Sequence, residues 1–356
     1  MLKALAYLLI PFSWLYGSIV YLRKLLYTTG IFPRNTFDFP IICVGNIAAG
    51  GTGKTPHIEW LIQHLSSTYT IGVISRGYKR KTVGYLLADE QSTAAQIGDE
   101  PFQIKRKFPL TAIAVSENRV LGIPHLLGDA PETQVVLMDD GFQHLSVQAG
   151  FNIILTDYQR PFYNDRLLPA GLLRENAASV NRAQMVVVTK CPHNLTQVQQ
   201  DAIVAKINPL PHQKVYFSSI AYLPLQPITQ TAQQQVNPKP DSTILALSGI
   251  AKAGLFHQHL QSMYNKVETL VFPDHVTYTT DRIQQLAAAV AATPNSIVIT
   301  TEKDAVKLQA PDVLTHIQHI PIWYIPIGVR FLGNQGEALL NDLKNYIETE
   351  INAINL

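Results

Sequence analysis

A glycine-rich segment, GNIAAGGTGKTP at residues 45–56, constrains the fold of this chain more than any other feature. It follows an apolar run at residues 39–44 and precedes a helical pattern of apolar residues that begins at Ile58. A turn between a strand and a helix leaves backbone N–H groups free to point at phosphate oxygens, and the helix N-terminus adds the positive end of its dipole. The segment therefore predicts a loop that binds nucleotide phosphates.

The loop matches the phosphate-loop pattern closely but not strictly, because Ala48 stands where the first glycine is expected. Gly50, Gly51 and Gly53 supply the flexibility instead. The pattern places Lys54 to reach the β- and γ-phosphates and the Thr55 hydroxyl to ligate Mg²⁺.

Short apolar runs alternate with helical segments along most of the chain. Runs rich in Val, Ile and Leu suit strands buried on both faces, and their alternation with helices implies right-handed crossovers and a mostly parallel sheet. Strands are expected at 41–44, 70–74, 111–115, 135–138, 152–155 and 185–188, with a helix at 196–207. A second series is expected at 244–247, 266–272, 296–300 and 322–325, with helices near Lys252 and at 281–292.

The predicted fold is α/β: a P-loop NTPase-like, mostly parallel sheet flanked by helices, with a second smaller α/β domain. The stretch 223–241 is rich in Gln, Pro and Thr and shows no helical period, which favours an irregular connection. The expected parts are an apolar N-terminal helix (1–30), the P-loop domain (31–215), a connecting segment (216–240), the smaller domain (241–335) and a closing helix (336–356).

Composition excludes some classes of protein. Charged residues make up 15% of the chain and the formal net charge is +2, so no nucleic-acid partner is expected. The two cysteines fit no metal spacing, and a cytosolic, reducing setting is expected. No protein partner is predicted.

The N-terminus carries no charged residue from Ala4 to Leu22, and Arg23 and Lys24 follow this run. A cleaved signal peptide is disfavoured because no small-x-small cleavage site follows. Three alternatives remain for this run: a membrane span, a buried core helix and an interfacial helix. The sequence favours the interfacial helix, with aromatic rings at the level of the lipid headgroups. The expected association with a membrane is peripheral or singly anchored.

Several charged side chains follow predicted strands. The strand at 135–138 ends in Asp139 and Asp140, a pattern that holds Mg²⁺ in phosphate-loop enzymes. Asp99 and Glu100 precede Pro101, so either could simply cap a helix. Candidate phosphate partners and neighbours of the site are Arg76, Arg119, Arg174 and His144, and Asp274 with His275 follows a strand in the second domain.

Seven motifs together, GNIAAGGTGKTP, SRGY, GDEP, DDGFQH, LPAGLLRE, FPDH and TEKDAVK, resemble the tetraacyldisaccharide 4'-kinase (lipid A 4'-kinase) family in order and rough spacing. The sequence departs from the family pattern at Lys79, Leu172 and Val276, where the family often has Gly, Pro and a second His. The resemblance covers nearly the whole length of the chain.

The resemblance implies ATP-dependent phosphorylation of the 4'-hydroxyl of a tetraacylated glucosamine disaccharide 1-phosphate in the inner membrane, which makes lipid IVA in lipid A biosynthesis. It implies that ATP is bound by Ala48, Ala49, Gly50, Gly51, Thr52, Gly53, Lys54 and Thr55. It implies a Mg²⁺ neighbourhood of Thr55, Asp139, Asp140 and Glu175, with Asp99 as the base on the sugar hydroxyl in a dyad with His275. Lys54 is expected to act in catalysis, and Arg76, Arg119, Arg174 and His144 in substrate binding.

Two alternatives remain from the residues themselves. A GTP-hydrolysing protein of metal-chaperone type shares the glycine-rich loop, but the segment Thr189-Lys190-Cys191-Pro192 lacks the Asp that would read guanine. A membrane-recruited ATP switch explains the loop and the apolar N-terminus, but not the motifs DDGFQH and LPAGLLRE.

Overall fold

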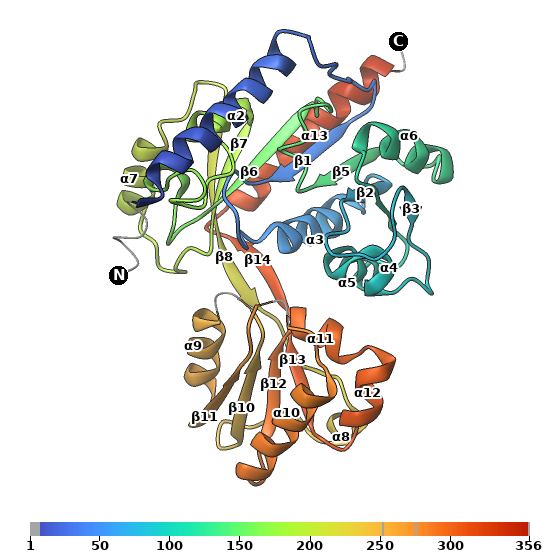
Figure 1. Cartoon of the computed structure of the whole chain (residues 1–356), viewed down its shortest axis with the longest axis vertical. Helices are drawn as coiled ribbons and strands as arrows, with labels where there is room; N and C mark the ends of the chain where they lie inside the picture. The colour runs from blue at the N-terminus through green and yellow to red at the C-terminus, as the bar shows by residue number, and fades with distance from the viewer. Residues whose placement is uncertain (1–7, 251–252, 275, 355–356) are drawn as a thin grey trace. The chain divides into compact units, whose positions relative to one another are not determined.

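The computed structural model describes residues 8–250, 253–274 and 276–354, which form two compact units (Figure 1). The first unit comprises residues 1–220 and 329–356, and the second comprises residues 221–328. The observed division differs from the expected one at both ends of the second unit. Residues 216–220 belong to the first unit, and the chain returns to it already at residue 329.

The first unit contains a nine-stranded sheet with the order β14-β8-β7-β6-β1-β5-β2-β4-β3. The pairs from β8 to β4 are parallel. The strands are β1 (Ile41–Gly45), β2 (Ile71–Ser75), β3 (Leu86–Leu87), β4 (Ala112–Val115), β5 (Val135–Asp139), β6 (Phe151–Asp157), β7 (Met185–Thr189), β8 (Lys214–Tyr222) and β14 (Ile327–Phe331). This parallel sheet confirms the predicted fold class.

Helices accompany this sheet. They are α2 (Ile10–Thr28), α3 (Lys54–Leu65), α4 (Ala94–Ile97), α5 (Asp99–Lys107), α6 (Arg119–Asp129), α7 (Gln197–Ile207) and α13 (Gln335–Ile354), with short 3₁₀ turns at Phe162–Asn164 and Ala177–Arg182. Local sequence explains several starts: the Asn118 side chain caps α6, and Thr196 with Gln199 forms a capping box at α7.

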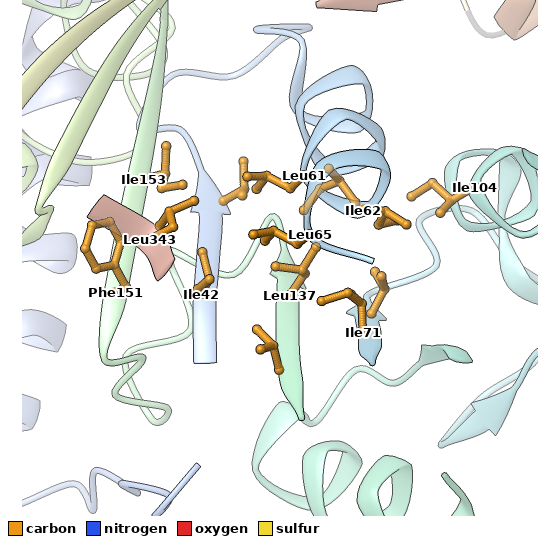
Figure 2. Close-up of a cluster of buried hydrophobic side chains, with 14 of the residues drawn as sticks. Ile42, Leu61, Ile62, Leu65, Ile71, Ile104, Leu137, Phe151, Ile153 and Leu343 are labelled. Atoms are coloured by element: carbon orange, nitrogen blue, oxygen red, sulfur yellow. The ribbon is translucent and has the colours of Figure 1, made fainter. Parts of the chain in front are cut away.

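Apolar side chains cover both faces of the sheet, which explains why its strands are continuously apolar. Ile42 of β1 belongs to the cluster that α3 and α13 cover, where Leu61 and Leu343 pack (Figure 2). Its neighbours Ile41 and Cys43 belong to the cluster on the opposite face. Successive strand residues point to opposite faces, so a strand buried on both sides needs apolar residues at every position.

Helix α2 lies against the loop that carries the LPAGLLRE motif. The Ser13 hydroxyl donates to the Leu167 carbonyl at 3.0 Å, and the Tyr16 hydroxyl donates to the Arg174 carbonyl at 3.0 Å. A Cβ atom on Gly17 would lie 2.8 Å from Leu167 Cδ1, so glycine permits the close approach. Within the described ranges, the structure contains no helix that combines the length and apolar character needed to cross a bilayer.

The second unit contains a five-stranded sheet with the order β11-β10-β12-β13-β9. Its strands are β9 (Gln226–Pro227), β10 (Thr243–Ser248), β11 (Lys266–Val271), β12 (Ile297–Thr301) and β13 (Ile322–Ile325), all parallel except β9. Its helices are α8 (Gln230–Gln233), α9 (Gly254–Met263), α10 (Thr280–Ala292), α11 (Glu302–Leu308) and α12 (Pro311–Ile317).

The expected irregular connection at 223–241 is wrong in part, because it contains β9 and α8. The Thr229 side chain ties this segment to the start of β13. Its hydroxyl donates to the Ile320 carbonyl at 2.7 Å and accepts from the Ile322 N–H at 3.1 Å. The helix expected near Lys252 is described from Gly254. Lys252 itself lies outside the described residues.

Candidate active site

The glycine-rich loop joins β1 to α3 at the carboxyl edge of the first sheet, as expected. Gly50 has a φ of 111° and Gly53 a φ of 92°, a backbone region that favours glycine. A Cβ atom added to Gly50 or Gly51 would meet no atom within 4 Å. The loop therefore leaves room beside its backbone for a ligand.

Two cations meet one carboxylate next to this loop. Lys54 Nζ lies 3.6 Å from Asp140 Oδ1, and Arg174 Nη2 lies 3.1 Å from the same oxygen. Burial alone would raise the pKa of Asp140, but the charges of Lys54 and Arg174 outweigh it and hold that pKa below its usual value. The Asp140 carboxylate thus marks a place where two cations converge on negative charge.

Asp139 is the last residue of β5 and pairs in register with Val44 of β1, so β5 lies directly beside the loop strand as predicted. Its side chain is buried, and Ser75 of β2 donates to Oδ2 at 2.9 Å. Oδ1 is buried and has no hydrogen-bond partner within the described residues. Burial, together with the charges of Glu100 and Asp140, raises the pKa of Asp139 to about 7.

The raised pKa predicts that Asp139→Asn stabilises the protein in the absence of ATP and metal. The folded-state pKa lies above the unfolded value, so this site contributes most stability at low pH and loses it as pH rises through about 7. At pH 8 the asparagine variant, which carries no charge, is expected to gain about 1–3 kcal/mol in its free energy of unfolding. Thermal melts in EDTA at pH 5 and pH 8 measure this. An equal change at both pH values would contradict the explanation.

Arg119 does not line an open site, which differs from the position expected for a substrate-binding cation. It is 1% exposed, and its guanidinium donates to the carbonyls of Ser116 and Asp139. The structure therefore places Arg119 behind the end of β5, where it supports Asp139. Arg76, by contrast, is exposed in the SRGY segment.

Glu175 is buried between two partners from the same region. Arg182 Nη1 lies 2.9 Å from Oε2, and the Gln143 amide donates to Oε1 at 3.2 Å. Gln143 also donates to the Asn46 carbonyl at 2.9 Å, so the DDGFQH and LPAGLLRE segments are tied to the start of the glycine-rich loop. A metal at Glu175 would replace or join the contact with Arg182.

No three His, Cys, Asp or Glu side chains of the described residues gather as a ready-made metal site. Mg²⁺ in phosphate-transferring sites commonly takes one or two carboxylates and completes its shell with phosphate oxygens and water. The Oδ1 of Asp139, which has no hydrogen-bond partner within the described residues, and the Thr55 hydroxyl in the first turn of α3 are the kinds of oxygen that such a ligand set uses.

His144 lies among cations at the end of the DDGFQH motif. Burial lowers its pKa to about 4, and the positive charges of Arg119, Arg76 and Arg23 act in the same direction. His144 is therefore neutral at physiological pH and is suited to a hydrogen bond rather than an ion pair. Arg23 of α2 donates to the neighbouring Gln143 carbonyl at 3.1 Å.

Asp99 opens α5 and is half-buried. The preceding Gly98 has a φ of 93°, and a Cβ atom there would lie 3.1 Å from the Cα of Gly77. The two glycines let the GDEP and SRGY segments pass close to each other. Glu100, one residue later, is near enough to act on the pKa of Asp139.

The FPDH and TEKD motifs lie together in the second unit. Lys303 Nζ is 3.8 Å from Asp274 Oδ1, and the Asp304 carboxylate accepts from the Gly249 N–H at 2.8 Å. Asp274 and Arg282 line a surface cavity of about 480 Å³. His275, the expected partner of Asp99, lies outside the described residues.

Sequence patterns did not assign three residues of the first unit to the phosphate loop, although Lys190 stands in the segment compared above with a guanine-reading motif. Asn46 donates to the Thr52 hydroxyl at 2.9 Å, Ser75 binds Asp139, and the Lys190 ammonium donates to the Gly51 carbonyl. Each follows a predicted strand by one or two residues or ends it, and that position is the signal that could have identified them.

Comparison with known proteins gives consistent matches over nearly the whole chain. The family model described as tetraacyldisaccharide-1-P 4'-kinase matches residues 5–348. Tetraacyldisaccharide 4'-kinase of Bacteroides thetaiotaomicron is 41% identical over 351 residues, which cover 95% of this chain and 92% of that protein. The protein of the same name from Porphyromonas gingivalis is 40% identical and covers 95% of this chain and 96% of its own length.

A solved structure agrees with these relatives. The crystal structure of LpxK from Aquifex aeolicus in complex with ATP aligns with a TM-score of 0.73 and 27% identity, covering 96% of this chain and 99% of that one. With the family model and the curated relatives, this match identifies the chain as a member of the tetraacyldisaccharide 4'-kinase family.

Proposed function

We propose that this protein transfers the γ-phosphate of ATP to the 4'-hydroxyl of a tetraacylated glucosamine disaccharide 1-phosphate, making lipid IVA in lipid A biosynthesis. The observation that carries the proposal is the convergence of Lys54 and Arg174 on Asp140, beside an open glycine-rich loop. Phosphoryl transfer depends on positioning and on neutralising charge, and these groups supply both.

The nucleotide phosphates would be held by the loop residues 48–55. Their N–H groups and the start of α3 favour negative charge. Lys54, which now contacts the Asp140 carboxylate, would turn to the transferring phosphoryl group. ATP binding thus replaces one anionic partner of Lys54 with another.

Mg²⁺ would be held by Thr55 and Asp139, with Asp140 and Glu175 in its neighbourhood. The ion supplies charge neutralisation between the phosphates when bound. Ser75 and Arg119 keep the end of β5 in place through Asp139. Arg76, Arg174 and His144 would contact the phosphorylated lipid headgroup or the leaving phosphates.

Asp99 would accept the proton of the 4'-hydroxyl, in a dyad with His275. Asp99 stands in the first turn of α5, where the positive end of the helix dipole favours a carboxylate. The close passage of Gly98 and Gly77 sets the position of Asp99 relative to the end of β2.

The protein would bind peripherally to the cytoplasmic face of the inner membrane through α2. The side chains of Phe12, Leu15, Ile19 and Leu22 are exposed and follow one stripe of the helix. Other residues of α2 contact the loops that carry Arg174 and Gln143. A membrane bound to the apolar stripe would lie next to the proposed phosphorylation site.

Replacing Phe12, Leu15, Ile19 and Leu22 with glutamine is expected to lower binding to anionic vesicles by at least about 100-fold, since each buried apolar side chain contributes about 1.5–3 kcal/mol. The kcat on detergent-dispersed lipid is expected to stay near the wild-type value, because the contacts of Ser13 and Tyr16 remain. Leu110→Gln and Val198→Gln, exposed elsewhere, serve as controls. Vesicle co-sedimentation at the wild-type level would refute the interfacial role of α2.

The function itself is tested with γ-labelled ATP and a tetraacyldisaccharide 1-phosphate acceptor. Label is expected in the lipid product at the 4' position. A GTPase of metal-chaperone type would release labelled phosphate from GTP without acceptor, and a membrane-recruited ATP switch would transfer nothing. Pro192, which stands where a guanine-reading Asp would be, disfavours the first alternative.

A further inference from the structure

Three successive carbonyls of the glycine-rich loop are held by side chains from the first unit. The Lys190 ammonium donates to the Gly51 carbonyl, and the Thr189 hydroxyl donates to the Thr52 carbonyl at 2.8 Å. The Gly53 carbonyl lies 2.7 Å from His57 Nδ1. We call these three side chains the carbonyl-holding set: His57, Thr189 and Lys190.

Holding a carbonyl fixes the N–H group of the following residue. The peptide unit is planar and trans, so the N–H of residue i+1 points away from the carbonyl of residue i. The carbonyl-holding set therefore turns the N–H groups of Thr52, Gly53 and Lys54 away from His57, Thr189 and Lys190. A run of N–H groups on one side of a loop is what binds a phosphate.

The members of the set are themselves fixed. His57 is buried, and burial lowers its pKa to about 4, so the ring is neutral. Because the Gly53 carbonyl can only accept, Nδ1–H is the donor to it, and Nε2 accepts from the Ser218 hydroxyl at 3.0 Å. Lys190 follows β7, and its ammonium also lies 3.1 Å from the Asp157 carboxylate at the end of β6.

Lys190 binds the part of the loop in which two glycines, Gly50 and Gly51, follow each other. Glycine loses more conformational freedom on ordering than any other residue. A charged donor forms a stronger hydrogen bond than a neutral one. Among the set, Lys190 is therefore the side chain with the largest expected effect on loop order.

We propose that Lys190 is a positioning residue for ATP: it holds the Gly51 carbonyl so that the loop N–H groups face the phosphates before ATP arrives. The proposal rests on the proposed function, since it concerns the same phosphate loop. It assigns to Lys190 no contact with the reacting atoms.

The test compares Lys190→Met with Lys190→Arg in the full-length protein. Lys190→Met is expected to raise the KM for ATP by about 10-fold, the effect of losing one charge-assisted hydrogen bond. The KM for the lipid acceptor is expected to change by less than about 2-fold, because the contact restrains only the nucleotide loop. Lys190→Arg, which keeps the charge and the donors, is expected to recover most of the loss.

A second variant separates positioning from folding. Lys190→Met removes the cation beside the buried Asp157 carboxylate, which can destabilise the fold. Lys190→Met/Asp157→Asn removes both charges, so it is expected to regain melting temperature while the KM for ATP stays high. Lys214→Met is the matched control, because Lys214 forms an ion pair with Asp342 at the opposite end of the parallel strands.

A wild-type KM for ATP in Lys190→Met would overturn the proposal, as would an equal rise in the KM for lipid. Recovery of ATP affinity in the double variant would also overturn it, because the defect would then come from the fold. Lys54→Ala in the same series keeps the two proposals apart. If Lys54→Ala is inactive and Lys190→Met binds ATP normally, the positioning role fails and the proposed function stands. If Lys54→Ala is fully active, the phosphate-loop assignment fails. If the wild-type protein transfers no label from ATP to the lipid acceptor, the proposed function fails.

Discussion

Lys54→Ala is expected to abolish phosphoryl transfer, with a kcat at least about 10³-fold below wild type. The ammonium group belongs to the loop itself and lies 3.6 Å from Asp140 Oδ1. An alanine cannot neutralise the charge that spreads over the phosphoryl oxygens in the transition state. Transfer of label from γ-labelled ATP to lipid in single-turnover reactions measures the loss.

The fold is expected to tolerate this change. Arg174 still lies beside Asp140 in the variant, so the carboxylate keeps a cation. The melting temperature of Lys54→Ala is therefore expected to stay close to that of Lys214→Ala, a control at a surface ion pair. Wild-type turnover with intact folding would refute the assignment of the phosphate loop.

Asp99→Ala is expected to lower kcat by roughly 10²- to 10⁴-fold, the usual range for loss of a general base. His275→Ala is expected to cost less, because in the dyad hypothesis it orients Asp99 and shares its proton. Residues that act as one unit have non-additive effects, so the double variant is expected to be little worse than Asp99→Ala. A double-mutant cycle on kcat, with the KM for ATP measured alongside, tests this.

Asp312→Ala provides the control for the Asp99 measurement. Asp312 also stands in the first turn of a helix, α12, so the control reports the loss of a helix-dipole contact alone. It is expected to leave kcat unchanged. If the losses from Asp99→Ala and His275→Ala multiply, the two residues act independently and the dyad hypothesis is wrong.

Apolar runs in the sequence identified the central strands because those strands are buried on both faces. Residues 135–138 read as a strand for this reason, and β5 does lie beside β1. The glycine-rich loop was predicted from the same logic, since only a strand on one side and a helix on the other give its N–H groups a common direction. The presence of the central strands and the position of the loop could therefore be predicted from local sequence patterns.

Features that depend on tertiary partners were not predicted. Strand β8, with the sequence KVYFSSIAY, mixes polar and apolar residues because its hydroxyls bind other elements: Ser218 contacts His57, and Ser219 donates to the Arg330 carbonyl. Arg119 was expected near a ligand, but its neighbours in space bury it behind Asp139. No local pattern reports such contacts between distant segments.

The position of helix α13 affects the order in which the two units can fold during synthesis. Leu339, Leu343 and Ile347 complete the cluster on one face of the first sheet, and the Tyr346 hydroxyl accepts from the Ile41 N–H at 3.2 Å. These residues leave the ribosome after residues 221–328, which form a continuous unit. The unit of residues 221–328 can therefore finish folding first, while the unit that bears the phosphate loop still waits for α13. A stop codon near residue 335 would remove the cover of β1 itself, so it would damage nucleotide binding far from the truncated end in sequence.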